Sequence, residues 1–234
     1  LEPVSAARLW EEYQKMLLSG HGEATFLALE KHNLLTYLFP MTAECCDEDA
    51  DFKQFSILAL KNTDERLRND KSINPAFLMA VLLWKPLLAN TEAMQKKGVP
   101  FNDAFFKSMG RTIEVQNKFI SIPRRFSLVI RDIWALQLRL QFNYGKKAFA
   151  TFENPRFRAA YDFLVLRSKV EPEHKPLADW WTQYQDADEQ GRRKLLNQAK
   201  QNSTPNKKRS RPRRRKPSGS RATASKSSTP KSGS

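Results

Sequence analysis

Apolar residues in the first 200 positions recur every three or four residues, and this spacing is the strongest constraint on the fold. In the stretch from 124 to 141 the residues that share one helix face are Phe126, Val129, Ile130, Ile133, Leu136 and Leu140. The chain has only eight glycines, and no alternating apolar run of strand length stands out. The sequence therefore predicts an all-α fold, an irregular array of many helices.

Capping residues and prolines place the helix ends. We expect helices over residues 5–18, 23–31, 52–66, 76–96, 102 or 103 to 119, 124–141, 155–168 and 177–185, with a short apolar segment at 34–39. Pro86 should kink the fourth helix, because proline lacks the backbone donor and crowds the preceding turn. Residues 44–51 are acidic and are expected to form a loop, and residues 186–200 are polar and compatible with a helix.

Residues 201–234 differ sharply in composition from the rest. They hold 11 of the 40 basic residues, none of the 25 acidic ones, and no Phe, Trp, Tyr, Leu, Ile or Val. Such a segment cannot bury enough apolar surface to offset the entropy of ordering, so we expect it to be disordered. Its charge favours a polyanionic partner, with nucleic acid ahead of membrane or acidic protein. The expected RNA-binding residues here are Lys207, Lys208, Arg209, Arg211, Arg213, Arg214, Arg215 and Lys216.

Catalytic and metal chemistry finds little support in the remaining sequence. Asp49 and Asp51 have the spacing of a metal-binding pair but fall in the expected loop, and the three histidines are scattered. Cys45 and Cys46 are adjacent, which favours reduced thiols and a cytoplasmic setting. No apolar run approaches the roughly 18 residues of a membrane span. We predict no catalytic residue, no metal site and no membrane partner.

Basic residues on the expected helices, and two lysines in the turn expected after residues 124–141, are the remaining candidates for function. The candidates for RNA binding are Arg124, Arg125, Arg131, Arg139, Lys146, Lys147, Arg156 and Arg158. The alternative is that they are ordinary surface charges, since several could pair with Asp132, Glu153 or Asp162.

Six ordered segments resemble the carboxy-terminal half of bacterial poly(A) polymerases. They are 5–18 (SAARLWEEYQKMLL), 34–40 (LLTYLFP), 60–64 (LKNTD), 74–78 (NPAFL), 122–141 (IPRRFSLVIRDIWALQLRLQ) and 154–167 (NPRFRAAYDFLVLR). The resemblance spans nearly all of residues 1–185 and ends in the basic tail typical of that family. This tail favours poly(A) polymerases over the related CCA-adding tRNA enzymes, which stay as an alternative.

The resemblance implies a head, neck, body and leg, in which the head carries a catalytic Gly-Ser turn and a metal-binding Asp-x-Asp. Enzymes of this family extend RNA 3′ ends with adenylate from ATP, using Mg²⁺. No position here matches the catalytic residues, so we expect this chain alone to be inactive and to carry no cofactor. A late-neck motif carries over as Arg8, Glu11 or Glu12, and Lys15, which would brace the neck and the nucleotide pocket.

The resemblance also divides the chain. Residues 1–40 would be late neck and the start of the body, 41–185 body and leg, and 186–234 a polar linker and the basic tail. Expected partners are single-stranded RNA 3′ ends, the nucleotidyltransferase head, and RNA-decay or RNA-chaperone proteins of the bacterial cytoplasm. The sequence begins at Leu1 without Met, so we expect a fragment. The alternative from another class is a free-standing, non-catalytic helical adaptor that binds RNA.

Overall fold

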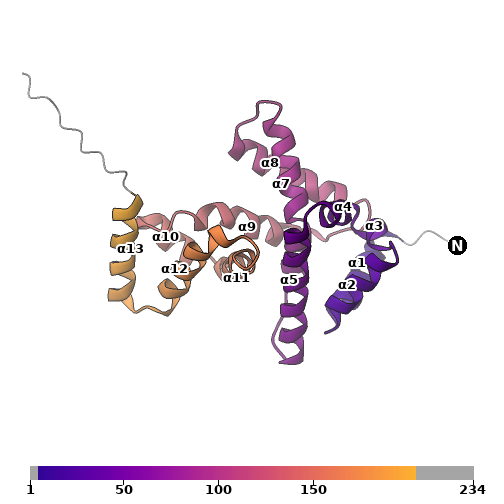
Figure 1. Ribbon diagram of the computed structural model, residues 1–234, viewed down its shortest axis with the longest axis horizontal. Coiled ribbons are helices and arrows are strands. Elements are labelled where there is room, and N and C mark those ends of the chain that lie inside the picture. The colour runs from indigo at the N-terminus through magenta and orange to yellow at the C-terminus, as the bar shows by residue number, and fades with distance from the viewer. Residues whose placement is uncertain (1–4, 204–234) are drawn as a thin grey trace, which may run out of the picture. The chain divides into compact units, whose positions relative to one another are not determined.

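The computed structural model describes residues 5–203, and this part is built from helices with no strand (Figure 1). In chain order the helices are α1 (Ala6–Leu17), α2 (Gly22–Lys31), α3 (Leu35–Leu38), α4 (Pro40–Glu48), α5 (Ala50–Arg68), α6 (Pro75–Leu82), α7 (Trp84–Gln95), α8 (Phe101–Gln116), α9 (Arg124–Leu140), α10 (Gly145–Phe152), α11 (Phe157–Arg167), the 3₁₀ turn η1 (Pro172–His174), α12 (Lys175–Asp186) and α13 (Glu189–Ser203). The all-α prediction is confirmed for the described residues. The predicted disorder of residues 201–234 is wrong for 201–203, which end α13, and for the rest it concerns residues that lie outside the described part.

The larger core surrounds α6, whose short apolar sequence is buried on nearly every side. Helices α5, α7, α9 and α11 pack around it. The indole N–H of Trp134 on α9 donates to the Ala80 carbonyl of α6 at 2.9 Å, and the Tyr13 hydroxyl of α1 donates to the Pro75 carbonyl at 2.9 Å. Buried aromatic donors thus tie the first and ninth helices to the same central element.

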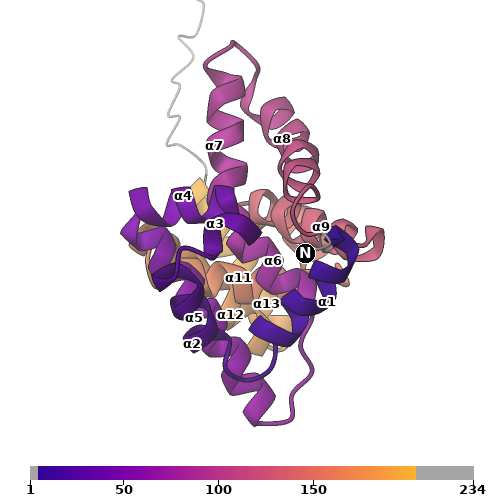
Figure 2. The same cartoon turned by 90° about the vertical axis from the view of Figure 1, so that its right-hand side faces the viewer.

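A second core lies towards the C-terminal end of the described chain. It contains Trp181 and Tyr184 of α12 together with apolar residues of α9, α10 and α11. Helices α9 and α11 contribute to both cores, so they join the two parts (Figure 1). Helices α7 and α8 pack against each other as a pair that extends away from α6 (Figure 2). The basic residues of α9 and α11 are therefore carried on the two helices that contribute to both cores.

The predicted acidic loop at 44–51 is wrong. Residues 40–48 form α4, because Pro40 has the backbone angle of a first helical position and Thr42, Ala43 and Cys46 form a buried stripe at helical spacing. Only Asp49 interrupts the helices, and its side chain accepts a hydrogen bond from the Phe52 N–H at 2.9 Å to cap α5. The acidic residues on the outer side of α4 obscured this stripe in the sequence.

The single kinked helix predicted for 76–96 is also wrong, because the chain forms two helices that meet at Leu83. Pro86 cannot donate to the Leu82 carbonyl, which would be its partner in a continuous helix. The hydroxyl of Thr42 on α4 donates to that carbonyl instead, at 2.7 Å. A buried side chain from another helix thus satisfies the acceptor that the proline leaves free.

Helix α10 was missed, since residues 146 and 147 were expected in a turn. Its eight residues have only two buried side chains, Ala148 and Thr151, which is too short a pattern to indicate a helix by periodicity. The polar segment near 186–200 is helical, as its composition allowed. Other helix ends differ from the predicted ones by only a few residues, among them the start of α11 at Phe157 after a turn at Asn154.

Candidate nucleic-acid interface

The four neck residues expected from the resemblance lie together on the outer side of α1. Ser5 caps this helix by accepting from the Arg8 N–H at 3.3 Å, and the buried stripe faces α2 and α6. Lys15 pairs with Glu12 at 3.0 Å, one turn away. Arg8 and Glu11 are exposed beside this pair. Their expected role in bracing a nucleotide pocket stays a prediction.

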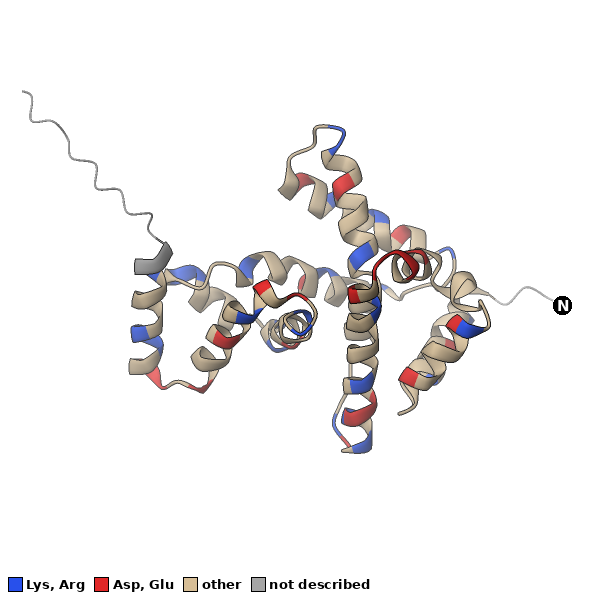
Figure 3. Ribbon diagram, viewed as in Figure 1, with Lys and Arg blue, Asp and Glu red and all other residues tan. Residues whose placement is uncertain are grey.

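The α9 stripe consists of Arg124, Arg131 and Arg139, which fall on the solvent side of α9 at spacings of seven and eight residues. Basic residues recur along α9 and α10 (Figure 3). Gly110 of α8 leaves space for this stripe, because a Cβ atom there would lie 2.9 Å from the Arg131 guanidinium. Arg125 lies to one side, with its guanidinium 4.8 Å from the ring centre of Phe126. The structure therefore places all four predicted arginines of α9 on exposed surface.

Exposed aromatic rings accompany the lysines of α10. Phe149 is 58% exposed and Phe142 is 40% exposed. The Lys147 ammonium lies 4.4 Å from the ring centre of Phe142, while Lys146 is fully on the surface. Positive charge beside an accessible ring is the composition of surfaces that stack single-stranded bases. The two exposed rings were not among the sequence candidates, because their exposure depends on the missed helix.

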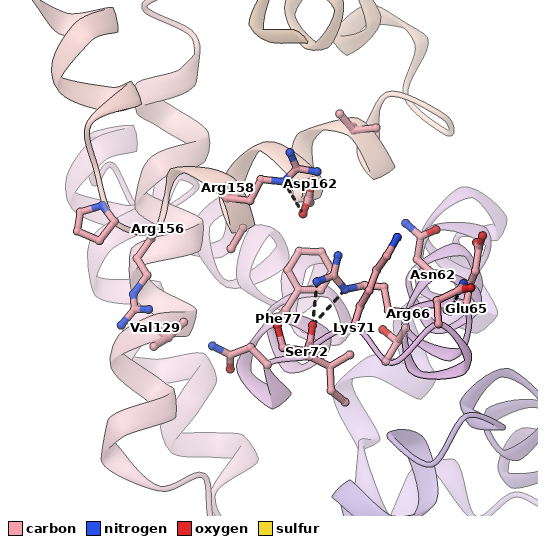
Figure 4. A pocket seen from close by; sticks show the side chains of 17 residues that line it. Asn62, Glu65, Arg66, Lys71, Ser72, Phe77, Val129, Arg156, Arg158 and Asp162 are labelled. Atoms are coloured by element: carbon pink, nitrogen blue, oxygen red, sulfur yellow. Dashed lines mark hydrogen bonds and ion pairs between the residues drawn. The ribbon is translucent and has the colours of Figure 1, made fainter. Parts of the chain in front are cut away.

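The α5–α11 cleft is a cavity of about 620 Å³ that opens between the end of α5, the 69–74 connection, α9 and α11 (Figure 4). Two predicted residues, Arg156 and Arg158, lie on one wall. Arg66 and Lys71 lie on the other, and sequence reasoning missed both. No local signal could have found them, since they are about 90 positions away from their counterparts.

Two of the four cations in the cleft are fixed by protein contacts (Figure 4). Arg66 donates to the Ser72 carbonyl through Nε at 3.3 Å and Nη2 at 2.8 Å. Arg158 pairs with Asp162 at 3.1 Å, and burial raises the pKa of that carboxyl in spite of the arginine. Within residues 5–203, the side chains of Lys71 and Arg156 have neither an ion-pair nor a hydrogen-bond partner.

One group of potential metal ligands exists in the described part of the chain, formed by Glu171, Glu173 and His174. The Arg167 guanidinium forms an ion pair with Glu171 and also contacts His174. Burial and the arginine charge lower the pKa of His174. The Arg167 guanidinium already supplies the positive charge that a metal ion would bring to these side chains. They therefore form an ion-pair network with Arg167.

The other sequence candidates for catalysis or metal binding include Asp49 and the two cysteines. Asp49 caps α5 and pairs with Lys85, and these hydrogen bonds lower the pKa of its carboxyl in spite of partial burial. Burial raises the pKa of Cys46 to about 12 and that of Cys45 to about 11, so both thiols are protonated near neutral pH. Among the described helices, none has the length and apolar character needed to cross a bilayer.

Two segments of this chain match regions of one known protein family. Residues 97–216 match the arginine-rich C-terminus of polymerase A, and residues 1–46 match a region described as a probable RNA- and SrmB-binding site of polymerase A. The chain belongs to the bacterial poly(A) polymerase family. The resemblance carried by the six segments is thereby confirmed.

Individual poly(A) polymerases agree with this assignment. Poly(A) polymerase I of Salmonella typhimurium is 39% identical over 222 residues, which cover 93% of this chain and 48% of that protein. Poly(A) polymerase I of Escherichia coli O157:H7 is 37% identical over 222 residues, with the same coverage. The Haemophilus influenzae protein is 37% identical over 221 residues, which are 92% of this chain and 49% of its own length. The chain thus spans about half the length of the poly(A) polymerases it matches.

The two family matches divide the candidate surfaces. The match of residues 1–46 includes α1 to α3 and most of α4, with the exposed face of α1 that carries Arg8 and Lys15. The match of residues 97–216 includes the α9 stripe, α10 and the wall of the α5–α11 cleft that carries Arg156. Arg66 and Lys71 lie between the two matched regions, so the cleft combines a wall from the poly(A) polymerase arginine-rich region with one from outside it.

Proposed function

We propose that this chain is the RNA-holding part of a poly(A) polymerase. It would bind single-stranded RNA near the 3′ end while the whole protein adds adenylate from ATP with Mg²⁺. The observation that carries the proposal is the match of residues 1–46 to a probable RNA-binding region, in a chain whose relatives are poly(A) polymerases.

The exposed charges support phosphate contacts as the main source of affinity. The α9 stripe, Lys146 and Lys147 provide cations on firmly packed helices, and Phe142 and Phe149 provide accessible rings. Phosphate contacts carry no sequence information, and stacking accepts every base. RNA binding by this chain should therefore be largely independent of sequence, with single strands preferred to duplexes.

Residues 1–46 also offer a surface for a protein partner. Leu27, Leu34 and Tyr37 are exposed, Tyr37 by 74%, and they lie on α2, α3 and the turn between them. The matching region is described as a probable binding site for SrmB as well as for RNA. Exposed apolar side chains of this kind are typical of protein contacts. We propose further that SrmB and the nucleotidyltransferase head are partners of this chain. We also propose that the chain acts in the bacterial cytoplasm.

Fluorescence anisotropy with a short labelled adenylate oligomer tests the RNA-binding proposal. Replacing Arg124, Arg131 and Arg139 with Gln should weaken binding about tenfold and reduce the slope of log K against log salt by about 2, because each lost phosphate contact on a single strand contributes about 0.7. A variant with Lys97, Lys107 and Arg111 changed to Gln removes the same charge from exposed positions near and on α8 and serves as the control.

The control should lose less than about threefold, the part expected from net charge alone. Equal losses in the two variants would contradict a role for the α9 stripe. If the unchanged chain failed to bind the oligomer at low salt, the proposed function itself would be wrong.

A further inference from the structure

The α5–α11 cleft has the features of a discrete binding site as well as those of a charged surface. We propose that it binds one nucleotide of a single-stranded RNA, with the phosphate at its cationic rim and the base against its apolar floor. The inference rests on the proposed RNA-binding function and goes beyond it, because it assigns a subsite to residues that lie partly outside the regions matched by the family.

The size and lining of the cleft suit a ligand that is partly apolar. A volume of about 620 Å³ falls in the range of about 300–1,000 Å³ typical of small-ligand sites. Phe77, Val129, Ala159 and Val165 supply apolar surface. The Phe77 ring is held edge-on against Phe163 of the core at 6.3 Å between ring centres, so this part of the floor is fixed before a ligand enters. A base could pack here at little cost in side-chain entropy.

The charges of the cleft favour an anion. Four cationic side chains line it against two carboxylates, those of Glu65 and Asp162. Asp162 is already paired with Arg158, whereas Lys71 and Arg156 have no side-chain partner in the described structure. Arg66 is held by two hydrogen bonds to a neutral carbonyl and forms no ion pair with a carboxylate in the described residues, although its charge also acts on Asp162. With four cations against two carboxylates, the cleft has an excess of two positive charges for a phosphate group.

The first turn of α11 adds backbone donors on the same wall. Arg156 is its N-cap residue and forms no side-chain cap, and within residues 5–203 the N–H groups of Arg158 and Ala159 have no acceptor. Both residues line the cleft. Free N–H groups at a helix N-terminus attract phosphate, and here they lie beside the cations that would bind the same group.

The edge of the cleft also presents polar side chains that could contact a base or ribose. Asn62 is exposed and has no side-chain partner among the described residues. Asn74 uses its Oδ1 atom to cap α6, which leaves its amide N–H₂ available. The combination of cations, amides and an apolar floor fits a nucleotide better than inorganic phosphate, which would not use the floor.

A matched pair of variants of the full chain tests this inference. Lys71→Gln with Arg156→Gln should weaken binding of the adenylate oligomer about tenfold and reduce the salt slope by about 0.7, the value for the one phosphate contact that the cleft would make. The control, Lys107→Gln with Arg111→Gln, removes two exposed charges from α8 and should change affinity less than about twofold. Circular dichroism should show that both variants keep the helical content of the parent.

An oligomer with a photoreactive azidoadenosine locates the bound base. We expect it to crosslink to the peptide that contains Phe77, and we expect this product to disappear in the Lys71 and Arg156 variant while crosslinks to α9 and α10 persist. No such crosslink in a chain that binds the oligomer would overturn the inference and leave the proposed function standing. A crosslink to the same peptide from free azido-ATP, with none from the azidoadenosine oligomer, would assign the cleft to a free nucleotide and overturn the RNA assignment.

Discussion

At the scale of single residues, the clearest case is a buried carboxylate that starts a helix far away in the sequence. Asp64 on α5 is 5% exposed and accepts hydrogen bonds from the backbone N–H groups of Gly22 at 2.8 Å and Glu23 at 3.0 Å. Gly22 is required in this contact, because a Cβ atom there would lie 2.4 Å from the Leu17 carbonyl oxygen. One charged side chain thus fixes α2, which lies in the segment that matches a probable RNA-binding region, against α5.

Replacing Asp64 with Ala should lower the free energy of unfolding by about 2 kcal/mol, since two buried helix-terminal donors lose their acceptor. Urea denaturation followed by circular dichroism measures this change. Asp132→Ala is the control, because Asp132 lies exposed on α9 and has no partner in the described structure. Equal stability of the two variants would mean that the Asp64 carboxylate does not stabilise α2.

At the scale of elements, the break between α6 and α7 depends on a third helix. Pro86 leaves the Leu82 carbonyl without its backbone donor, and the buried Thr42 hydroxyl of α4 replaces that donor at 2.7 Å. The missed helix α4 and the misjudged kink are therefore two parts of one arrangement. The orientation of the α7 and α8 pair relative to α6 follows from it, since α4 also packs against α7.

Thr42→Val should destabilise the fold by about 1–3 kcal/mol, the cost of leaving a buried acceptor unsatisfied. In a Pro86→Ala background the same substitution should cost at least about 1 kcal/mol less, because the alanine N–H can supply the missing donor. Thermal or urea unfolding of the four proteins gives the coupling.

Thr25→Val is a suitable comparison for this cycle, since the Thr25 hydroxyl bonds only to a carbonyl of its own helix turn. Additive effects of Thr42→Val and Pro86→Ala would show that the hydroxyl does not compensate for the proline.

At the scale of the whole molecule, charge and packing are distributed differently along the chain. Residues 5–203 contain both cores and the candidate surfaces on α9, on α10 and in the cleft. The last 34 residues hold 11 of the 40 basic residues and no acidic residue, and those beyond Ser203 lie outside the described structure. The basic tail should therefore contribute to RNA affinity without contributing to the stability of the fold.

Removing residues 204–234 should reduce the salt slope of RNA binding by about 3.5, if about five of its charges contact phosphates. The urea unfolding transition should stay the same, because both cores lie before this segment. Anisotropy titrations at several salt concentrations measure the slope. Unchanged RNA affinity at low salt would contradict the proposed role of the basic tail.

Sequence reasoning worked where the deciding interactions were local. The Ser5 cap of α1, the Asn74 cap before Pro75 and the apolar face of α9 all depend on residues within one or two turns of each other. It failed at α4, where exposed acidic residues masked a short buried stripe, and at α10, which is held by contacts with α9 and α13. Short helices are stabilised mainly by such tertiary packing.

The sequence by itself determined the all-helical class, the family and the position of the concentrated basic charge, because spacing, capping and the order of motifs are properties of neighbouring residues. Only the tertiary structure decided which charges share a surface. It placed Arg66 and Lys71 opposite Arg156 and Arg158, and Asp64 and Thr42 beside the backbone groups that they satisfy. These contacts join residues about 40 to 90 positions apart, and only the packing of helices around α6 brings them within reach.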